Sequence, residues 1–417
     1  MSRFLVCPHR SQHSFMRRSY LALQGTASPF FSKLAEALRT RGHAVQKVNF
    51  CGGDLLYGGA ARHAVNYEGR LGELPAWYSD VIGGGDFTDV LMFGDCREVH
   101  VPAHAIAQKA GMRVHVFEEG YVRPHWLTLE RHGVNGRSLL PRDPGWYRDR
   151  RKETPASPPA APTGYNLRER AFHDIAYRGA NTLFSRRFPH YRSHRPHNGF
   201  VEYAGLAWRA LAQRGFERDA GRVTDQLLRA TGGYFLFPLQ LNSDAQLVVH
   251  SPFGGTRPAV DQVLRSFAAH ADSNVRLVVK NHPLDTGLID HRRHVLLLAQ
   301  ELGIADRVTF IDAGHLPTLL EYARGVIVVN STVGLSALHH RRPLIALGHA
   351  IYDMQGLTWQ GSLDDFWKAE FEPDRELYQA FLDYVIHHTQ INGDFYTRTG
   401  IERAIRGAVS RLEASHD

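Results

Sequence analysis

Two adjacent glutamates, Glu118 and Glu119, close an apolar run that begins at Val114. Alternating residues along such a run are typical of a β-strand, and the carboxyl ends of strands form the edge at which α/β proteins bind ligands. Carboxylates at that edge could act as a nucleophile or as a general acid or base. A solvated turn after a strand would have the same two residues, so the pair needs support from elsewhere in the chain.

A lysine and a histidine follow a second apolar run, at residues 275–279. Lys280 and His282 are separated by one residue, and Pro283 comes directly after the histidine. Because proline disfavours helix in the residue before it, the loop should stay extended and present both side chains at the sheet edge. Such a pair can bind a phosphate and stabilise it as it leaves, although a histidine that caps a turn would have the same sequence.

Small polar residues follow a third apolar run. Asn330, Ser331 and Thr332 lead directly into an apolar helix. The free backbone N–H groups at a helix N-terminus suit a phosphate, and plain helix capping by the hydroxyl groups explains the same residues equally well. A second phosphate-suited loop in the same predicted sheet favours the binding interpretation.

Further polar groups stand at other predicted strand ends. Gln240 and Asp244 follow the run at 234–238, and Asp244 could face the glutamate pair across a cleft or cap a turn. Asp54 and Asp95 follow strands in the first part of the chain. Either carboxylate might shape an acceptor pocket there.

The elements that would position these residues alternate between strand and helix in two separate parts of the chain. This alternation predicts an α/β protein with two Rossmann-like units. Strands are predicted at 3–7, 44–50, 89–93, 113–117, 234–238, 275–279, 307–311, 325–329 and 343–347, and helices near 30–41, 101–110, 257–270, 291–302, 316–323 and 333–340. The resulting division is a first domain at 1–150, a linker with a basic helical segment at 151–230, a second domain at 231–363, and C-terminal helices at 364–417 that pack back toward the first.

The composition is that of a globular protein with a basic surface. Of 417 residues, 43% are hydrophobic and 22% charged, and the net charge is +7. No apolar run approaches the roughly 20 residues needed to cross a bilayer, so we expect a cytoplasmic protein. The cysteines Cys7, Cys51 and Cys96 lie far apart, which indicates neither a disulfide framework nor a zinc site. Nucleic acid is the least favoured anionic partner because no zinc-finger or RNA-binding signature occurs.

A proline-rich stretch at 150–165 cannot supply a packed element, and an arginine-rich segment follows it. In that segment Phe184, Phe188 and Tyr191 are interleaved with arginines between 168 and 195. The pattern fits either a solvated helical face or a contact with an anionic membrane surface.

Three absences narrow the chemistry. No Asp-x-Asp motif follows a predicted strand, which disfavours a metal-dependent sugar transferase. The chain has neither a P-loop nor a dinucleotide-binding glycine motif after its first strand. It also lacks the Gly-x-Ser-x-Gly turn of the α/β-hydrolases.

As a set, these motifs resemble the capsule polysaccharide synthesis proteins of the KpsS/LipB type, which are β-Kdo glycosyltransferases. The resemblance covers most of the chain and rests on motifs that occur in order: Gln24-Gly25 with Pro29-Phe30-Phe31, Val48-Asn49-Phe50 with Gly52-Gly53-Asp54, Phe93-Gly94-Asp95-Cys96-Arg97, Glu118-Glu119-Gly120-Tyr121-Val122-Arg123-Pro124, Thr128-Leu129-Glu130, Gly133-Val134-Asn135-Gly136, Pro238-Leu239-Gln240 with Asp244, His282-Pro283 and Asn330-Ser331-Thr332.

The resemblance implies a GT-B-like fold, in which two Rossmann-like domains face each other across a cleft. It implies CMP-Kdo as the donor, no metal cofactor, and a phosphatidylglycerol-type lipid at the anionic inner leaflet as the acceptor. The protein would be peripheral on the inner membrane, with other capsule biosynthesis and export proteins as partners. On the acceptor side the matching residues are Gln24, Asp54, Asp95 and Arg123.

Retention of configuration, which the resemblance also implies, needs a nucleophile and an acid/base. By this match Asp244 is the nucleophile and Glu119 the base, supported by Glu118, and the donor is held by Gln240 and by the lysine–histidine and Asn-Ser-Thr loops. Two other functions stay open from the residues: a GT-B transferase or epimerase that uses a UDP-sugar, and a non-catalytic carrier of lipid or polysaccharide in capsule export.

Overall fold

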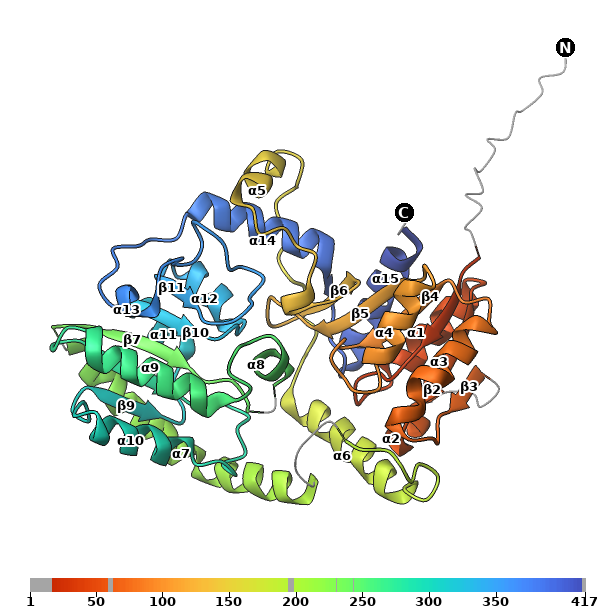
Figure 1. Ribbon diagram of the computed structural model, residues 1–417, viewed down its shortest axis with the longest axis horizontal. Coiled ribbons are helices and arrows are strands. Elements are labelled where there is room, and N and C mark those ends of the chain that lie inside the picture. Colours follow the sequence, from red (N-terminus) through yellow and green to blue (C-terminus); the bar gives the residue numbers. More distant parts are fainter. Residues whose placement is uncertain (1–16, 59–62, 194–198, 230, 243, 415–417) are drawn as a thin grey trace, which may run out of the picture.

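The computed structural model describes residues 17–58, 63–193, 199–229, 231–242 and 244–414. They form two α/β lobes that lie side by side (Figure 1). The first lobe is built on a seven-stranded sheet and the second lobe on a five-stranded sheet. This arrangement confirms the predicted GT-B-like class, with two Rossmann-like domains. No helix in the described ranges is long and apolar enough to cross a bilayer.

The sheet of the first lobe has the order β12-β6-β5-β4-β1-β2-β3, and only β6 and β12 run antiparallel to their neighbours. The strand predicted at 3–7 lies outside the described residues, and the first described strand, β1, begins later in the chain, at Ser19. The strands are β1 (Ser19–Ala22), β2 (Ala44–Asn49), β3 (Ala64–Asn66), β4 (Asp89–Phe93), β5 (Arg113–Glu119), β6 (Trp126–Arg131) and β12 (Gln390–Asn392).

Helices cover both faces of this sheet because each buries an apolar stripe against it. On one face, Phe30, Leu34 and Leu38 of α1 share a core with residues of α15, and α3 and α4 supply the core of the other face. The helices of this lobe are α1 (Phe30–Thr40), α2 (Gly52–Leu56), α3 (Leu74–Gly83), α4 (Val101–Lys109) and α15 (Arg398–Ala414), with short 3₁₀ turns at Leu71–Glu73 and Asn135–Arg137.

The second sheet is wholly parallel, in the order β11-β10-β7-β8-β9. Its strands are apolar on both faces, as expected where helices cover both sides. The elements are β7 (Tyr234–Pro238), β8 (Arg276–Lys280), β9 (Val308–Ile311), β10 (Gly325–Val328), β11 (Leu344–Ala346), α8 (Ala245–Val249), α9 (Thr256–His270), α10 (His291–Glu301), α11 (Leu316–Glu321), α12 (Val333–His339) and α13 (Leu363–Phe366).

Two segments cross between the lobes. Helix α14 (Arg375–Thr389) leads from the second lobe to β12 and α15, which complete the first lobe (Figure 1). In the other direction, α5 (Pro144–Arg150) leaves the first lobe and packs on α14, where Tyr147 joins the core of the second lobe. The proline-rich stretch has no regular element after Thr154, and Asn392 binds it by donating a hydrogen bond to the Ala161 carbonyl.

Two long helices lie along the lower edge of the molecule in Figure 1. They are α6 (Leu167–Leu183), which packs on α2, and α7 (Gly199–Arg229), which reaches β9. Where they meet, Arg178 of α6 and Glu202 of α7 form an ion pair of 2.5 Å. Each lobe therefore has one of these helices against its lower side.

Candidate active site between the lobes

The two glutamates lie inside β5 and are separated by the strand itself. Successive side chains of a strand point to opposite faces of the sheet. The carboxylate of Glu119 accepts a 2.9 Å hydrogen bond from the Tyr396 hydroxyl and lies 3.4 Å from the Arg170 guanidinium. The carboxylate of Glu118 instead accepts the backbone N–H of Glu119, at 2.9 Å. The two glutamates therefore have separate surroundings. Glu119 forms an ion pair with Arg170, and Glu118 accepts a backbone hydrogen bond.

The carboxyl group of Glu118 is close enough to Asp244 of the other lobe for the two charges to interact. Burial raises the pKa of the Glu118 carboxyl to about 7, and the nearby carboxylates of Glu119 and Asp244 add to that rise, against the lowering effect of the Glu119 N–H group and of Arg97. A carboxyl with this pKa is half protonated near neutral pH, which suits both proton donation and proton removal. The effect of Asp244 on this pKa indicates that groups from both lobes belong to the site.

Asp244 stands at the N-terminus of α8, where its Oδ1 accepts the backbone N–H of Gln246 at 2.9 Å. Burial raises the pKa of this carboxyl, while the Gln246 N–H, Arg123 and Gln240 lower it. Both interpretations of the sequence therefore apply, because the aspartate caps a helix and also faces the other lobe. The cap fixes one oxygen and leaves Oδ2 without a capping bond.

Gln240 and Asn330 are bonded to each other instead of pointing free side chains at a ligand. Gln240 Nε2 donates to Asn330 Oδ1 at 3.0 Å, and Asn330 Nδ2 donates to the carbonyls of Gln246 and His250, at 2.7 and 3.0 Å. Both side chains are buried. In this structure their hydrogen bonds hold the segment that positions Asp244, and direct binding of the donor by either side chain stays a prediction.

Cationic side chains gather at the carboxyl end of β8. Lys280 ends the strand and His282 follows in an extended loop, as predicted, while Pro283 is exposed in the turn. Burial lowers the pKa of His282 to about 4, and the positive charges of Lys280, Arg123 and Arg170 lower it further. His282 Nδ1 accepts the Leu284 N–H at 3.1 Å, so the neutral ring has its proton on Nε2. The result is an N–H donor among three cations.

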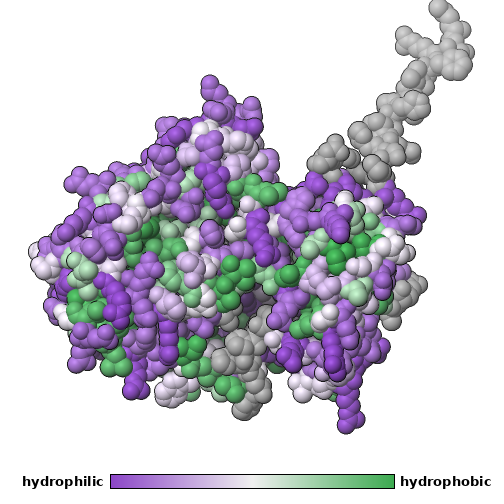
Figure 2. Space-filling model, in the orientation of Figure 1, coloured by the Kyte–Doolittle hydropathy of each residue, from purple (hydrophilic) through white to green (hydrophobic). Residues whose placement is uncertain are grey.

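One of these three cations is partly neutralised, because the Arg170 guanidinium lies 3.4 Å from the Glu119 carboxylate. Within the described ranges, no carboxylate lies within ion-pair distance of Lys280 or Arg123. Lys280 is buried, and its ammonium group donates only a long 3.4 Å hydrogen bond to the Asn281 carbonyl. Buried or clustered cations are stabilised when an anion binds among them. Figure 2 shows the surface hollowed between the two lobes, where such an anion could enter.

The Asn-Ser-Thr loop has less to offer a phosphate than predicted. The Ser331 hydroxyl accepts the Val333 N–H at 3.2 Å, which is an ordinary capping role, and the Tyr352 hydroxyl donates to the Ser331 carbonyl at 2.5 Å. The Thr332 side chain makes no capping bond. Helix α12, which follows, has seven residues, and its N-terminal dipole is correspondingly small.

Two predicted acceptor-side residues are structural residues of the first lobe. Asp54 Oδ2 accepts hydrogen bonds from Gln24 Nε2 and the Phe50 N–H, both at 3.0 Å, and its Oδ1 accepts the Tyr177 hydroxyl at 2.7 Å. Gln24 also accepts a 3.1 Å bond from Arg97. Both side chains are buried, and their polar atoms are used to bind α2 to α6. Arg123, by contrast, is close enough to Asp244 and to His282 for its charge to lower the pKa of both.

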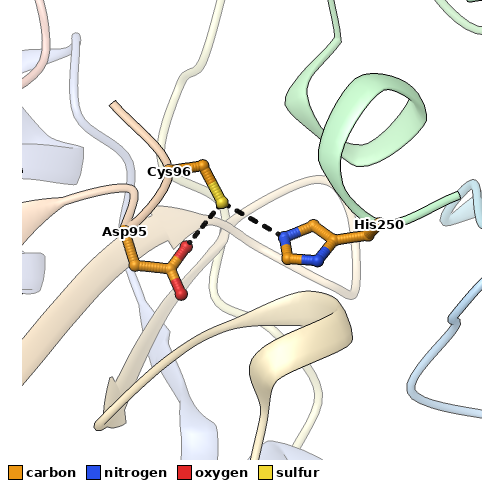
Figure 3. A group of neighbouring side chains, drawn as sticks. All are labelled: Asp95, Cys96 and His250. Carbon is orange, nitrogen blue, oxygen red and sulfur yellow. Dashed lines mark hydrogen bonds between the residues drawn. The ribbon is translucent and has the colours of Figure 1, made fainter. Parts of the chain in front are cut away.

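Asp95, the remaining acceptor-side candidate, belongs to a contact between the lobes (Figure 3). The Cys96 thiol donates to Asp95 Oδ1 at 3.2 Å and lies 3.3 Å from Nε2 of His250, from the second lobe. Among the described residues these three form the one group of metal-ligand type, with ligand atoms within 4.8 Å. Burial and Asp95 raise the pKa of the thiol to about 12, and Arg137 lies 3.7 Å from Asp95.

Residues 88–396 match the family model described as "Capsule polysaccharide biosynthesis protein". That range holds the facing groups of both lobes, including Glu118, Asp244, Lys280 and His282. The chain belongs to the capsule polysaccharide biosynthesis protein family.

Relatives of this capsule biosynthesis protein match along nearly their whole length. "Capsule polysaccharide export protein KpsS" of Escherichia coli is 36% identical over 91% of this chain and 97% of its own. "Capsule polysaccharide modification protein LipB" of Neisseria meningitidis is 33% identical over 91% of both chains. A solved structure, "Thermosulfurimonas dismutans KpsC, beta Kdo 2,7 transferase", is similar with 14% identity, a TM-score of 0.45, and coverage of 94% of this chain and 99% of that one.

Sequence reasoning did not place two residues of this capsule biosynthesis protein at the site. Arg170 lies on α6, and its guanidinium sits beside Glu119 and 5.0 Å from the centre of the Tyr396 ring. Tyr396 comes from the returning C-terminal segment, 277 positions beyond Glu119. No local pattern signals such a contact, because it depends on how the chain returns from the second lobe.

Replacing Asn330 by alanine is expected to lower the free energy of unfolding of the second lobe by about 2 to 4 kcal/mol, because Gln240 and two backbone carbonyls lose buried partners. Thermal unfolding followed by circular dichroism measures the change. Ser331→Ala is the matched control, since it removes one capping bond of a partly exposed residue and should cost about 1 kcal/mol or less. Equal midpoints for the two variants would contradict the positioning role.

Proposed function

We propose that this protein is a glycosyltransferase that moves Kdo from CMP-Kdo to a phosphatidylglycerol-type lipid, with retention of configuration. The proposal is supported above all by one arrangement: the carboxyl groups of Glu118 and Asp244, from different lobes, interact near a cationic cluster in which Lys280 and Arg123 have no ion-pair partner among the described residues. A carboxyl pair and an anion site are what a retaining transferase with a charged donor requires.

The cationic cluster suits a donor that carries two anions. CMP-Kdo has a phosphate in its leaving group and a carboxylate on the anomeric carbon of the sugar. Lys280 and the Nε2–H of His282 are placed to bind the phosphate, and Arg123, which lies near Asp244, is placed to bind the sugar carboxylate. Fixed cations can stabilise a departing monophosphate, so in this proposal the reaction needs no metal.

The reaction proceeds in two displacements. Asp244 Oδ2 attacks the anomeric carbon of Kdo, the bond from that carbon to the phosphate oxygen breaks, and CMP leaves with the electron pair. Glu118 then removes the proton from the acceptor hydroxyl, whose oxygen attacks the same carbon and releases the Asp244 carboxylate. Each displacement inverts the carbon, so two of them retain its configuration.

In this mechanism the two glutamates exchange the roles that the sequence analysis gave them. The Oε1 atom of Glu119 is engaged by the Arg170 guanidinium and by the Tyr396 hydroxyl, so it is not free to accept the proton of the acceptor. Glu118 has the pKa of about 7 that a general base needs near neutral pH. We therefore assign the base to Glu118 and a positioning role to Glu119, which orients Arg170 toward the cleft.

The proposed acceptor places the protein at an anionic membrane surface, in company with other capsule biosynthesis and export proteins. Its family membership favours that setting. A lipid with a glycerol hydroxyl offers the primary alcohol that Glu118 would deprotonate.

Incubation of the protein with CMP-Kdo and a fluorescent phosphatidylglycerol analogue tests the proposal. The expected result is release of CMP and an acceptor whose mass increases by one Kdo residue, with a β-linkage in the NMR spectrum. UDP-N-acetylglucosamine in place of CMP-Kdo is the control for a UDP-sugar enzyme. Turnover of the UDP-sugar, or tight CMP binding without any transfer, would contradict the proposal and favour an epimerase-like enzyme or a carrier, respectively.

A further inference from the structure

Helix α6 carries a stripe of apolar side chains on its exposed face. Phe172 is 68% exposed, Leu183 is 76% exposed, and Ile175 between them is exposed as well. With 3.6 residues per turn, these three positions fall on one side of the helix. Arg168 lies on the same side near the start of the helix, Arg186 follows in the turn after its end, and both are exposed.

Helix α7 repeats this arrangement. Trp208 is 69% exposed and Leu211 is 82% exposed, and Val201, two turns before the tryptophan, is exposed too. The same side continues with the exposed Arg218 and with Arg222, whose guanidinium lies 3.4 Å from the exposed Asp219 carboxylate. Single exposed apolar residues are common on protein surfaces, but two helices with apolar stripes next to arginines mark an interaction surface.

These stripes are not the packing faces of the helices. On α6, Tyr177 and Ala180 are buried and approach Gly52 and Gly53 of α2. On α7, Ala220 and Leu227 belong to the core of the second lobe. Both helices therefore have their lobe on one side and solvent on the apolar side, along the lower edge of the molecule in Figure 1.

The exposed face differs from the segment in which the sequence suggested a membrane contact. Phe188 is buried there, and with Tyr191 it lines an open surface pocket of about 370 Å³ next to Cys51 and Gly52. Phe184 is half-buried. The aromatic residues of that segment thus pack inward, and the apolar contact surface comes from the two helices instead.

The positive charge near the apolar stripe of α6 favours an anionic partner. Between residues 167 and 193 the chain has six arginines and two acidic residues. Of these two, Asp174 pairs with Arg178 at 3.1 Å, so its charge is compensated. An apolar stripe bordered by arginines is the pattern of helices that lie in the plane of an anionic bilayer.

We propose that the exposed stripes of α6 and α7 dock the protein on an anionic lipid bilayer. The placement rests on the proposed function in one respect, because it explains how a lipid acceptor reaches the cleft. Arg170 projects from the opposite side of α6 to Phe172 and lies beside Glu119. A headgroup that rises past α6 from the bilayer would therefore meet the cationic cluster.

Vesicle sedimentation with the full chain tests the docking face. The variant Phe172→Ser/Ile175→Ser/Trp208→Ser/Leu211→Ser is expected to bind phosphatidylglycerol–phosphatidylcholine vesicles at least about a hundredfold more weakly than the unmodified protein, since four large apolar side chains no longer enter the bilayer. The matched control Leu296→Ser/Leu297→Ser, on the exposed face of α10, should bind like the unmodified protein. Unchanged binding by the fourfold variant, with an unchanged thermal midpoint, overturns the proposal.

Two further measurements separate the alternatives. The unmodified protein should bind pure phosphatidylcholine vesicles at least about tenfold more weakly, and equal binding would overturn the assignment to anionic lipid. Light scattering in solution should give a monomer for both proteins. If the unmodified protein is instead a dimer, the fourfold variant is a monomer, and neither binds vesicles, the partner of the stripes is a second copy of the chain.

With a short-chain phosphatidylglycerol in solution, the fourfold variant should keep its transfer rate. If neither protein transfers Kdo there while vesicle binding behaves as expected, the proposed function fails and the docking face stands.

Discussion

Replacing Asp244 by asparagine is expected to lower the rate of Kdo transfer by at least about a thousandfold, because the nucleophile of the first displacement is lost. The helix cap survives, since an asparagine side-chain oxygen accepts the Gln246 N–H as the carboxylate does. Binding of CMP should also survive, because Lys280 and His282 are unchanged. The measurements are the initial rate of CMP release and calorimetric titration with CMP.

Two other variants make this result specific. Asp143→Asn changes an exposed cap with the same geometry, a 2.9 Å bond to the N–H two residues on, at the N-terminus of α5, and it should leave the transfer rate unchanged. Lys280→Met should show the reverse of Asp244→Asn, with CMP affinity lowered about tenfold or more. Transfer by Asp244→Asn within tenfold of the unmodified rate would remove this residue from the mechanism.

The second lobe is the part of the fold that the sequence predicts best. Its strands are buried on both faces, so each is a short continuous apolar run, and each is followed by a helix with an apolar stripe. The strand predicted at 234–238 is β7 without any difference in its ends, and the helix predicted at 257–270 is α9 within one residue.

The completion of the first lobe could not be predicted in detail. Strand β12 has three residues and pairs antiparallel with β6, to which Gln390 contributes a 3.0 Å bond from its side chain to Thr128. The two residues are 262 positions apart, and a three-residue strand has no periodicity to detect. Strand β1 is similarly short, with four residues and no flanking turn signal.

The candidate site shows the same division between local and non-local information. Lys280, His282 and Asp244 stand where their motifs place them, at the carboxyl ends of β8 and β7. Which glutamate faces the cleft depends on the phase of β5, and that strand is apolar on both faces: Val116 packs in one core and Phe117 in the other. The alternation that would reveal the phase is therefore missing from the sequence.

Replacing Glu118 by glutamine is expected to lower the transfer rate by about 10²- to 10⁴-fold, the usual contribution of a general base. The pH dependence of kcat/KM shows whether Glu118 is the base. Because the pKa of Glu118 is raised to about 7, its basic form accumulates as the pH rises through that value, and kcat/KM of the unmodified protein should rise with it. In Glu118→Gln this limb of the profile should disappear. Glu119→Gln should keep the limb, and its loss there would return the base to Glu119.

Stability should change in the opposite direction to activity in the same variant. Folding raises the pKa of Glu118 from 4.5 to about 7, so the folded state binds more protons than the unfolded chain between these values, and stability falls as the pH rises through them. The variant Glu118→Gln has no carboxyl group at this position, so its stability does not fall with pH for this reason. Its thermal midpoint relative to the unmodified protein should therefore be higher at pH 8 than at pH 4. Glu119→Gln should be less stable at pH 8, because it gives up the ion pair with Arg170. A carboxyl that costs stability in its ionised form and is required in that form for transfer is what a catalytic base between two lobes should be.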